Sequence, residues 1–148
     1  MSNPNPVPYE TTHLVRDNCL CLHMQRAARS LARQFDDALR PLGLTNGQFS
    51  LLMALNRPKP AGMGPVATLL AMDRTTLTAA LKPLERRGWV MLAVDPTDRR
   101  GRLLNLTPAG REVLSSAVPI WRRTHAAVER RLPNGDAERL RNDLRALT

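Results

Sequence analysis

The stretch that decides the fold lies between residues 84 and 110 and has three parts. They read Leu84-Glu85-Arg86-Arg87-Gly88-Trp89-Val90, then Asp95-Pro96-Thr97-Asp98-Arg99-Arg100-Gly101, then Leu106-Thr107-Pro108-Ala109-Gly110. The first part predicts a helix that a glycine stops, followed by β-forming residues. The second is a turn-rich segment with arginines, and the third begins a helix with a threonine cap and a proline at the first helical position. A helix, a β-hairpin with a basic tip and a second helix follow one another in this order in a winged helix.

Helices are also predicted before this stretch. Residues 63–70 and 74–87 form two short helices, joined by a turn over 71–73, which is the pattern of a helix-turn-helix. An earlier helix covers residues 45–56, with a capping box between Thr45 and Gln48. The expected buried face of the helix over residues 45–56 consists of Phe49, Leu51, Leu52 and Leu55. That of the helix over residues 74–87 consists of Leu77, Ala80, Leu81 and Leu84.

The two ends of the chain carry apolar stripes without an evident partner. Over residues 17–43, where Asp17 and Asn18 are the expected caps, apolar residues recur at heptad-like spacing on one long helix. Another helix starts after Thr107 and contains Pro119, and a last helix from Asp136 carries three leucines. Such stripes must be buried against another helix or another subunit.

Composition and charge favour a polyanionic partner. The chain has 148 residues, a formal net charge of +9 and only 3% aromatic residues, so its core must be aliphatic. Excess positive charge favours nucleic acid first and an anionic membrane second. Almost all the cations are arginines, which bind phosphate or guanine through paired hydrogen bonds. Replacement of lysine by arginine in a GC-rich genome explains this bias equally well.

Membrane and secreted classes are not expected. No apolar run approaches the roughly 18 residues of a membrane span, and residues 1–16 lack a secretory signal and are expected to be a flexible arm. Cys19 and Cys21 form a single Cys-x-Cys pair, which cannot staple a fold. A cytoplasmic location therefore fits the sequence best.

The order of elements and the three quoted motifs resemble the MarR family of bacterial regulators. The resemblance covers about residues 17–147. It implies a mainly α fold with a small β-hairpin wing: a winged helix-turn-helix domain over residues 44–107 and a helical dimerisation module over residues 17–43 and 108–148. It also implies a homodimeric transcriptional regulator, expected to be a repressor, that binds double-stranded DNA at a pseudo-palindromic operator.

Candidate DNA contacts follow from this arrangement. The second helix of the motif enters the major groove, so its residues off the buried face are candidates for phosphate and base contacts. The resemblance also places Arg100 in the minor groove, oriented by a charge-assisted bond from Asp98. The full set is Arg74, Thr75, Thr76, Thr78 and Lys82 on the helix, and Asp98, Arg99, Arg100 and Arg102 on the wing.

Other polar residues have competing interpretations. Some MarR relatives sense peroxides through a thiol near the start of the first helix, where Cys21 stands, with Cys19 beside it. We favour a structural role for Cys21, because it lies on the apolar stripe. The family also binds small aromatic or phenolic acids, and His23, Arg26 and Phe49 are candidates for lining that pocket.

Catalysis, metal binding and cofactors are not expected. The sequence has no catalytic carboxylate pair, phosphate-binding glycine loop or nucleophilic triad, and the histidines are too scattered to form a metal site. The remaining alternatives are a thiol-based oxidant sensor of the same family and an architectural DNA-binding protein.

Overall fold

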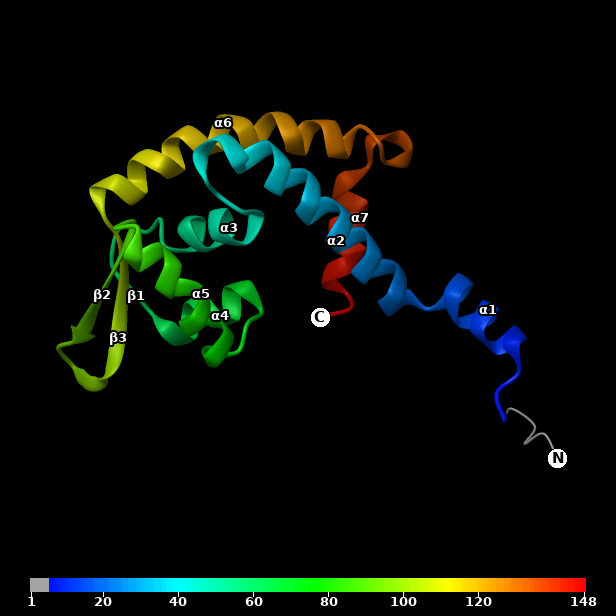
Figure 1. Cartoon of the computed structure of the whole chain (residues 1–148), viewed down its shortest axis with the longest axis horizontal. Coiled ribbons are helices and arrows are strands. Elements are labelled where there is room, and N and C mark those ends of the chain that lie inside the picture. Colours follow the sequence, from blue (N-terminus) through cyan, green and yellow to red (C-terminus); the bar gives the residue numbers. More distant parts are fainter. Residues whose placement is uncertain (1–5) are drawn as a thin grey trace.

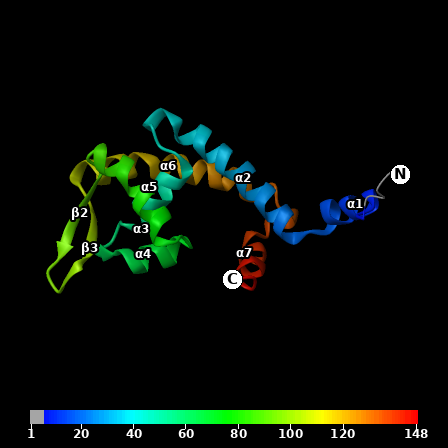
Figure 2. The ribbon, with the colours of Figure 1, turned by 60° about the horizontal axis from the view of Figure 1, so that its bottom comes forward.

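The computed structural model describes residues 6–148; residues 1–5 of the predicted arm lie outside the described part. The molecule is elongated, with the β-hairpin at one end, α1 at the other, and α2 and α6 side by side between them (Figures 1 and 2). The expected mainly α fold with a small β wing is confirmed. The elements are α1 Tyr9–Asn18, α2 Leu20–Leu39, the 3-10 turn η1 Arg40–Leu42, α3 Asn46–Ala54, β1 Ala61–Gly62, α4 Met63–Leu70, α5 Arg74–Arg86, β2 Val90–Asp95, β3 Asp98–Leu106, α6 Pro108–Glu129, the 3-10 turn η2 Pro133–Gly135 and α7 Ala137–Arg145.

The core lies where α3, α4, α5 and the sheet meet the neighbouring parts of α2 and α6. It is aliphatic, as the composition predicts, and its most deeply buried side chains include Leu52, Leu77 and Leu104. Each such side chain contributes roughly 1.5–3 kcal/mol by leaving water. This core holds α5 and the hairpin in a defined relation to each other.

The helix-turn-helix forms as predicted. The α3 capping box is present, with the Thr45 side chain accepting from the Gln48 N–H and the Gln48 side chain accepting from the Thr45 N–H. Helix α4 covers the predicted range, and α5 ends before Gly88, whose φ of 74° is in the left-handed region. The predicted faces are buried, except that Ala80 is only half-buried.

The sheet is larger than the sequence indicates. Strands β2 and β3 form the expected antiparallel hairpin, but β3 begins at Asp98, inside the segment predicted to be a loop. A third strand, β1, pairs with β3 through Ala61 and Leu104. Because β1 has two residues and follows a proline-rich segment, it has no periodic pattern and forms only through this long-range pairing.

The N-terminal part differs from the expectation. Residues 9–18 form helix α1, where the sequence predicts an arm without regular structure. The long helix begins at Leu20 rather than after Asp17 or Asn18, because Cys19 is extended and caps α2 with its Sγ, which accepts from the Leu22 N–H. The Asn18 side chain instead donates to the Leu14 carbonyl and closes α1.

Helix α6 begins at its predicted cap, and α7 begins directly after Asp136, the predicted start of the last helix. The Thr107 hydroxyl accepts from the Gly110 N–H at the start of α6, and the Asp136 carboxylate accepts from the Arg139 N–H at the start of α7. On α7 and just after it, Leu140, Leu144 and Leu147 remain exposed. Over the described residues, no helix is both long enough and apolar enough to span a membrane.

Candidate nucleic-acid interface

Helix α5 presents a polar face to solvent. The five candidates on this helix, Arg74, Thr75, Thr76, Thr78 and Lys82, are all exposed, whereas the leucines on its other face are buried. The division follows from the sequence, since these residues alternate with the leucines at helical spacing.

Two of the α5 threonines have local partners. The Asp73 carboxylate caps the helix by accepting from the Thr76 N–H at 2.7 Å and from the Thr76 hydroxyl at 3.0 Å. These bonds lower the pKa of the Asp73 carboxyl below its ordinary value. The Thr78 hydroxyl donates to the Arg74 carbonyl at 2.8 Å. Both side chains are nevertheless exposed.

The wing tip is built by its two carboxylates. Asp95 Oδ1 accepts from the N–H and the hydroxyl of Thr97, at 2.9 and 2.8 Å, and these bonds lower the pKa of the Asp95 carboxyl. Asp98 Oδ1 accepts from the backbone N–H of Arg100 at 3.0 Å. The expected bond from Asp98 to the Arg100 guanidinium is therefore replaced by one to the Arg100 backbone.

Because the carboxylates of Asp95 and Asp98 bond to groups of the turn, they do not pair with the guanidinium groups of the wing arginines. Within residues 6–148, the guanidinium groups of Arg99 and Arg100 have no polar partner, and both side chains are exposed. Arg102 donates to the carbonyl oxygens of Arg99 and Gly101, at 3.4 and 3.1 Å. The wing therefore projects unneutralised positive charge from a hydrogen-bonded turn.

A groove joins the helix to the wing. It has a volume of about 570 Å³ and lies between the start of α4, helix α5 and the hairpin. It brings together Arg74 and Thr78 from α5 with Asp98, Arg100 and Arg102 from the wing. Thr75, Thr76, Lys82 and Arg99 are exposed outside its lining. The other residues that line it are Gly62, Met63, Gly64, Pro65, Leu81, Leu92, Asp95 and Gly101.

The base of the wing is held by contacts that the sequence analysis did not predict. The Thr107 N–H donates to the Trp89 carbonyl at 3.1 Å, and Gly110 lies directly against the same carbonyl. The Arg87 guanidinium stacks on the Trp89 ring at 4.6 Å and donates to the Gly43 carbonyl, next to the end of α2. The motif glycine at 110 could have indicated this close approach, but Arg87 carries no local signal.

The three residues expected to line an effector pocket are not brought together. His23 and Arg26 lie on the exposed face of α2, in a hollow lined only by residues of that helix. Phe49 lies in a separate apolar cleft of about 500 Å³ between α3, α4 and α6. There it faces Trp121, with ring centroids 6.3 Å apart, and Trp121 in turn stacks on His125.

Both cysteines are free thiols. Cys19 is half-buried at the start of α2, while Cys21 is exposed and accepts from the Gln25 side chain at 3.3 Å. Within a single chain Cys21 is thus not packed in the way a structural role requires. Among residues 6–148, no group of three or more histidine, cysteine or acidic side chains is placed to hold a metal ion.

A helix-turn-helix with an exposed polar second helix, followed by a β-hairpin with free arginines, defines a winged helix-turn-helix protein. The family model described as "MarR family" matches residues 44–101. The M. tuberculosis regulator MosR, solved in complex with DNA, is 39% identical, with 88% of this chain and 93% of that chain covered and a TM-score of 0.81. The chain belongs to the MarR family of transcriptional regulators.

Two further relatives extend the comparison. The transcriptional repressor CouR, solved on a 23-mer DNA duplex, is 28% identical over 90% of this chain and 94% of that chain, with a TM-score of 0.80. The transcriptional activatory protein BadR of Rhodopseudomonas palustris is 35% identical over 99 residues. This match covers 65% of the present chain and 57% of BadR.

Proposed function

We propose that this chain is a sequence-specific regulator of transcription that binds double-stranded DNA in the cytoplasm. The observation that carries the proposal is the groove in which Arg74 and Thr78 of α5 face Arg100 and Arg102 of the wing. Helix α5 would enter the major groove, where threonine hydroxyls and methyls can contact phosphates, bases and thymine methyls. Arg100 would reach the neighbouring minor groove, whose negative potential attracts a guanidinium. MosR and CouR were both solved bound to DNA, which supports DNA binding by this chain.

We propose further that the functional unit is a homodimer. Of the twelve large hydrophobic side chains exposed within residues 6–148, eight lie on or beside α1, α7 and the start of α2. A second copy that covers these helices would bury them and would place two α5 helices on a pseudo-palindromic site. Residues 17–43 and 108–148 then serve as the dimerisation module, and residues 44–107 bind DNA.

A small-molecule effector would act at the cleft between these two parts. The cleft joins Phe49 and Met53 of α3 with Leu69 of α4 and with Trp121 and Arg122 of α6. Aromatic walls with one cation at the edge suit an aromatic acid, the ligand class expected for the family. A ligand there would change the position of α6 relative to α3 and α4, and so release a repressor from its operator.

The thiol-based alternative has one observation in its favour. Cys21 is exposed near the start of α2, a position at which oxidants can reach the thiol. The organic hydroperoxide resistance regulator of Bacillus subtilis is 28% identical over 108 residues. If peroxide releases the wild-type protein from DNA but leaves Cys21→Ser bound, the oxidant-sensing function is correct; equal behaviour of the two proteins excludes it.

The test of the main proposal is selection of bound sequences from random duplex DNA. We expect one enriched pseudo-palindrome, bound much more tightly than random duplex and with strong salt dependence. Equal affinity for selected and random duplexes would instead identify an architectural DNA-binding protein. Transcription from a promoter carrying the selected site, with and without aromatic acids, then tests repression and its release.

A further inference from the structure

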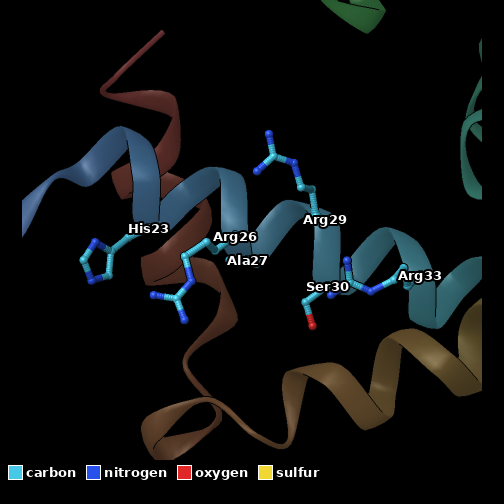
Figure 3. Close-up of a pocket in the computed structure, with 6 residues that line it drawn as sticks. All are labelled: His23, Arg26, Ala27, Arg29, Ser30 and Arg33. Atoms are coloured by element: carbon cyan, nitrogen blue, oxygen red, sulfur yellow. The ribbon is translucent and has the colours of Figure 1, made fainter. Parts of the chain in front are cut away.

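A second cluster of arginines lies far from the wing, on helix α2. Figure 3 shows His23, Arg26, Ala27, Arg29, Ser30 and Arg33 around a hollow of about 550 Å³. The spacing of 23, 26, 30 and 33 places these four side chains on one helical face. His23, Arg26 and Ser30 point to the same side, Arg33 extends back toward Ser30, and Arg29 stands on the opposite edge (Figure 3). The small side chains of Ala27 and Ser30 form the floor between longer walls.

The guanidinium groups of this face are not neutralised by the chain itself. Arg26, Arg29 and Arg33 are exposed, and within the described residues 6–148 they have no hydrogen-bond or ion-pair partner. The carboxylates of the same region are used elsewhere. Asp17 pairs with Arg16, Asp37 pairs with Arg40, and Asp36 accepts from the Asn46 N–H.

The like charges of this cluster lower the stability of helix α2. Like charges three and four residues apart destabilise a helix by a few tenths of a kcal/mol each. Arg26 and Arg29 stand three apart, and Arg29 and Arg33 four apart. A bound anion would turn this repulsion into attraction, because a guanidinium donates two parallel hydrogen bonds to a phosphate.

The remaining polar groups complete a set of donors. Ser30 Oγ accepts from the Gln34 side chain at 3.2 Å, which leaves its hydroxyl proton for an incoming oxygen. His23 Nδ1 lies 2.8 Å from the Cys19 carbonyl, so that bond holds the ring with Nε2 directed away from the backbone. Arg26 and Arg33 are about 10 Å apart along the helix axis, which suits a ligand with more than one anionic group.

We propose that this face of α2 binds a small phosphate-bearing ligand with at least two anionic groups. The ligand class differs from that of the proposed effector cleft, because the hollow is lined by three arginines and by no phenylalanine or tryptophan, and Phe49 lies elsewhere. The site is separate from the DNA groove, which is formed by α4, α5 and the hairpin at the other end of the molecule (Figure 1). The proposal therefore does not depend on DNA binding, but it rests on the proposed homodimer leaving this face of α2 uncovered.

Inorganic pyrophosphate is the probe for this site. Calorimetric titration of the full-length protein at constant ionic strength, without divalent cations, should show a saturable site in the wild type. The Arg26→Gln/Arg33→Gln variant should bind pyrophosphate at least about tenfold more weakly. The Arg26→Lys/Arg33→Lys variant keeps the charge but loses the paired bonds, so its affinity should fall between the two.

Matched control variants test whether pyrophosphate binding requires the α2 site or only the positive charge of the protein. Arg123→Gln/Arg130→Gln removes the same charge from exposed arginines that have no side-chain partner within the described residues, and should keep wild-type affinity. Arg74→Gln/Arg100→Gln removes the same charge from the DNA groove and should also keep the wild-type affinity for pyrophosphate. The proposal is wrong if the wild type does not bind pyrophosphate, or if either control loses as much affinity as the α2 variant.

DNA is the other source of phosphate, and a parallel measurement distinguishes it. The Arg26→Gln/Arg33→Gln variant should bind the selected duplex like the wild type. If it loses affinity for DNA and not for pyrophosphate, the face contacts the DNA backbone and the small-ligand proposal fails. If the wild type binds no DNA but binds pyrophosphate through α2, only the proposed regulatory function fails.

Discussion

Replacing Gly110 by alanine should destabilise the junction between the wing and α6. Gly110 is buried in the first turn of α6, and a Cβ there would lie 2.1 Å from the Trp89 carbonyl oxygen and 3.0 Å from the Trp89 carbonyl carbon. Real Cβ atoms essentially never approach other heavy atoms within 3.0 Å. The obstacle is backbone rather than a flexible side chain, so α6 must move away from Trp89 by close to an ångström.

The expected cost follows from what that movement breaks. The Trp89 carbonyl accepts from the Thr107 N–H at 3.1 Å, and the Thr107 hydroxyl donates to the Gly88 carbonyl. Each hydrogen bond contributes roughly 0.5–1.5 kcal/mol, and overpacking of a close contact costs about 1–3 kcal/mol. Alanine regains at most about 1 kcal/mol through its helix propensity. We expect a net loss of about 3 kcal/mol, or a Tm lower by about 10 °C for a chain of this size.

Thermal unfolding followed by circular dichroism measures the effect. Gly47→Ala is the matched control, because Gly47 lies in helix α3 with no atom within 4 Å of the added Cβ and no positive φ. That variant should melt at or slightly above the wild-type temperature, since alanine is favoured over glycine in a helix. If the Tm of Gly110→Ala equals that of Gly47→Ala, the contact between α6 and Trp89 is not as close as the structure shows.

Three further predictions concern the interface, the dimer and a helix cap. Arg100→Ala should weaken binding to the selected duplex by about 1–3 kcal/mol in fluorescence anisotropy and leave the oligomeric state unchanged; wild-type affinity would contradict the placement of the wing in the minor groove. Leu140→Ser/Leu144→Ser should shift the protein toward monomer in sedimentation velocity, because both side chains are exposed in the single chain; an unchanged dimer would show that α7 is not in the interface. Asp73→Ala should lower the Tm at pH 7, because the carboxylate caps α5. The hydrogen bonds from Thr76 lower the folded-state pKa of Asp73, so its stabilisation is complete above the unfolded value of about 3.9 and is lost as pH falls through the folded value. The Tm difference between wild type and variant should therefore shrink in acid, and a constant difference would contradict this cause.

Much of the geometry of the candidate nucleic-acid interface could be predicted because its signals are local. The alternation of leucines with polar residues along α5 assigns the exposed face without knowledge of the rest of the fold. The wing was recognised from the order of a glycine stop, a turn-rich basic segment and a threonine cap. The sequence did not indicate which group of Arg100 meets Asp98, because a carboxylate two residues earlier can reach either the guanidinium or the backbone N–H, and the turn geometry selects the latter.

The residues that line the proposed effector cleft could not be predicted from local sequence patterns. His23, Arg26 and Phe49 were grouped by chemistry, but 23 residues and a change of helix direction separate Arg26 from Phe49. The partner that Phe49 meets is Trp121, more than seventy residues further along the chain. No periodic pattern within one helix contains that information.

The sequence by itself determined the helices other than α1, the caps at Thr45 and Thr107, the start of the last helix at Asp136 and the end of α5 at Gly88, because each depends on residues within a few positions. It also determined which face of α5 is polar. Only the tertiary structure decided the rest: the pairing of β1 with β3, the groove that brings Arg74 to Arg100, and the cleft in which Phe49 meets Trp121. These features depend on contacts between segments far apart in the chain, and their positions follow from how the shared aliphatic core packs.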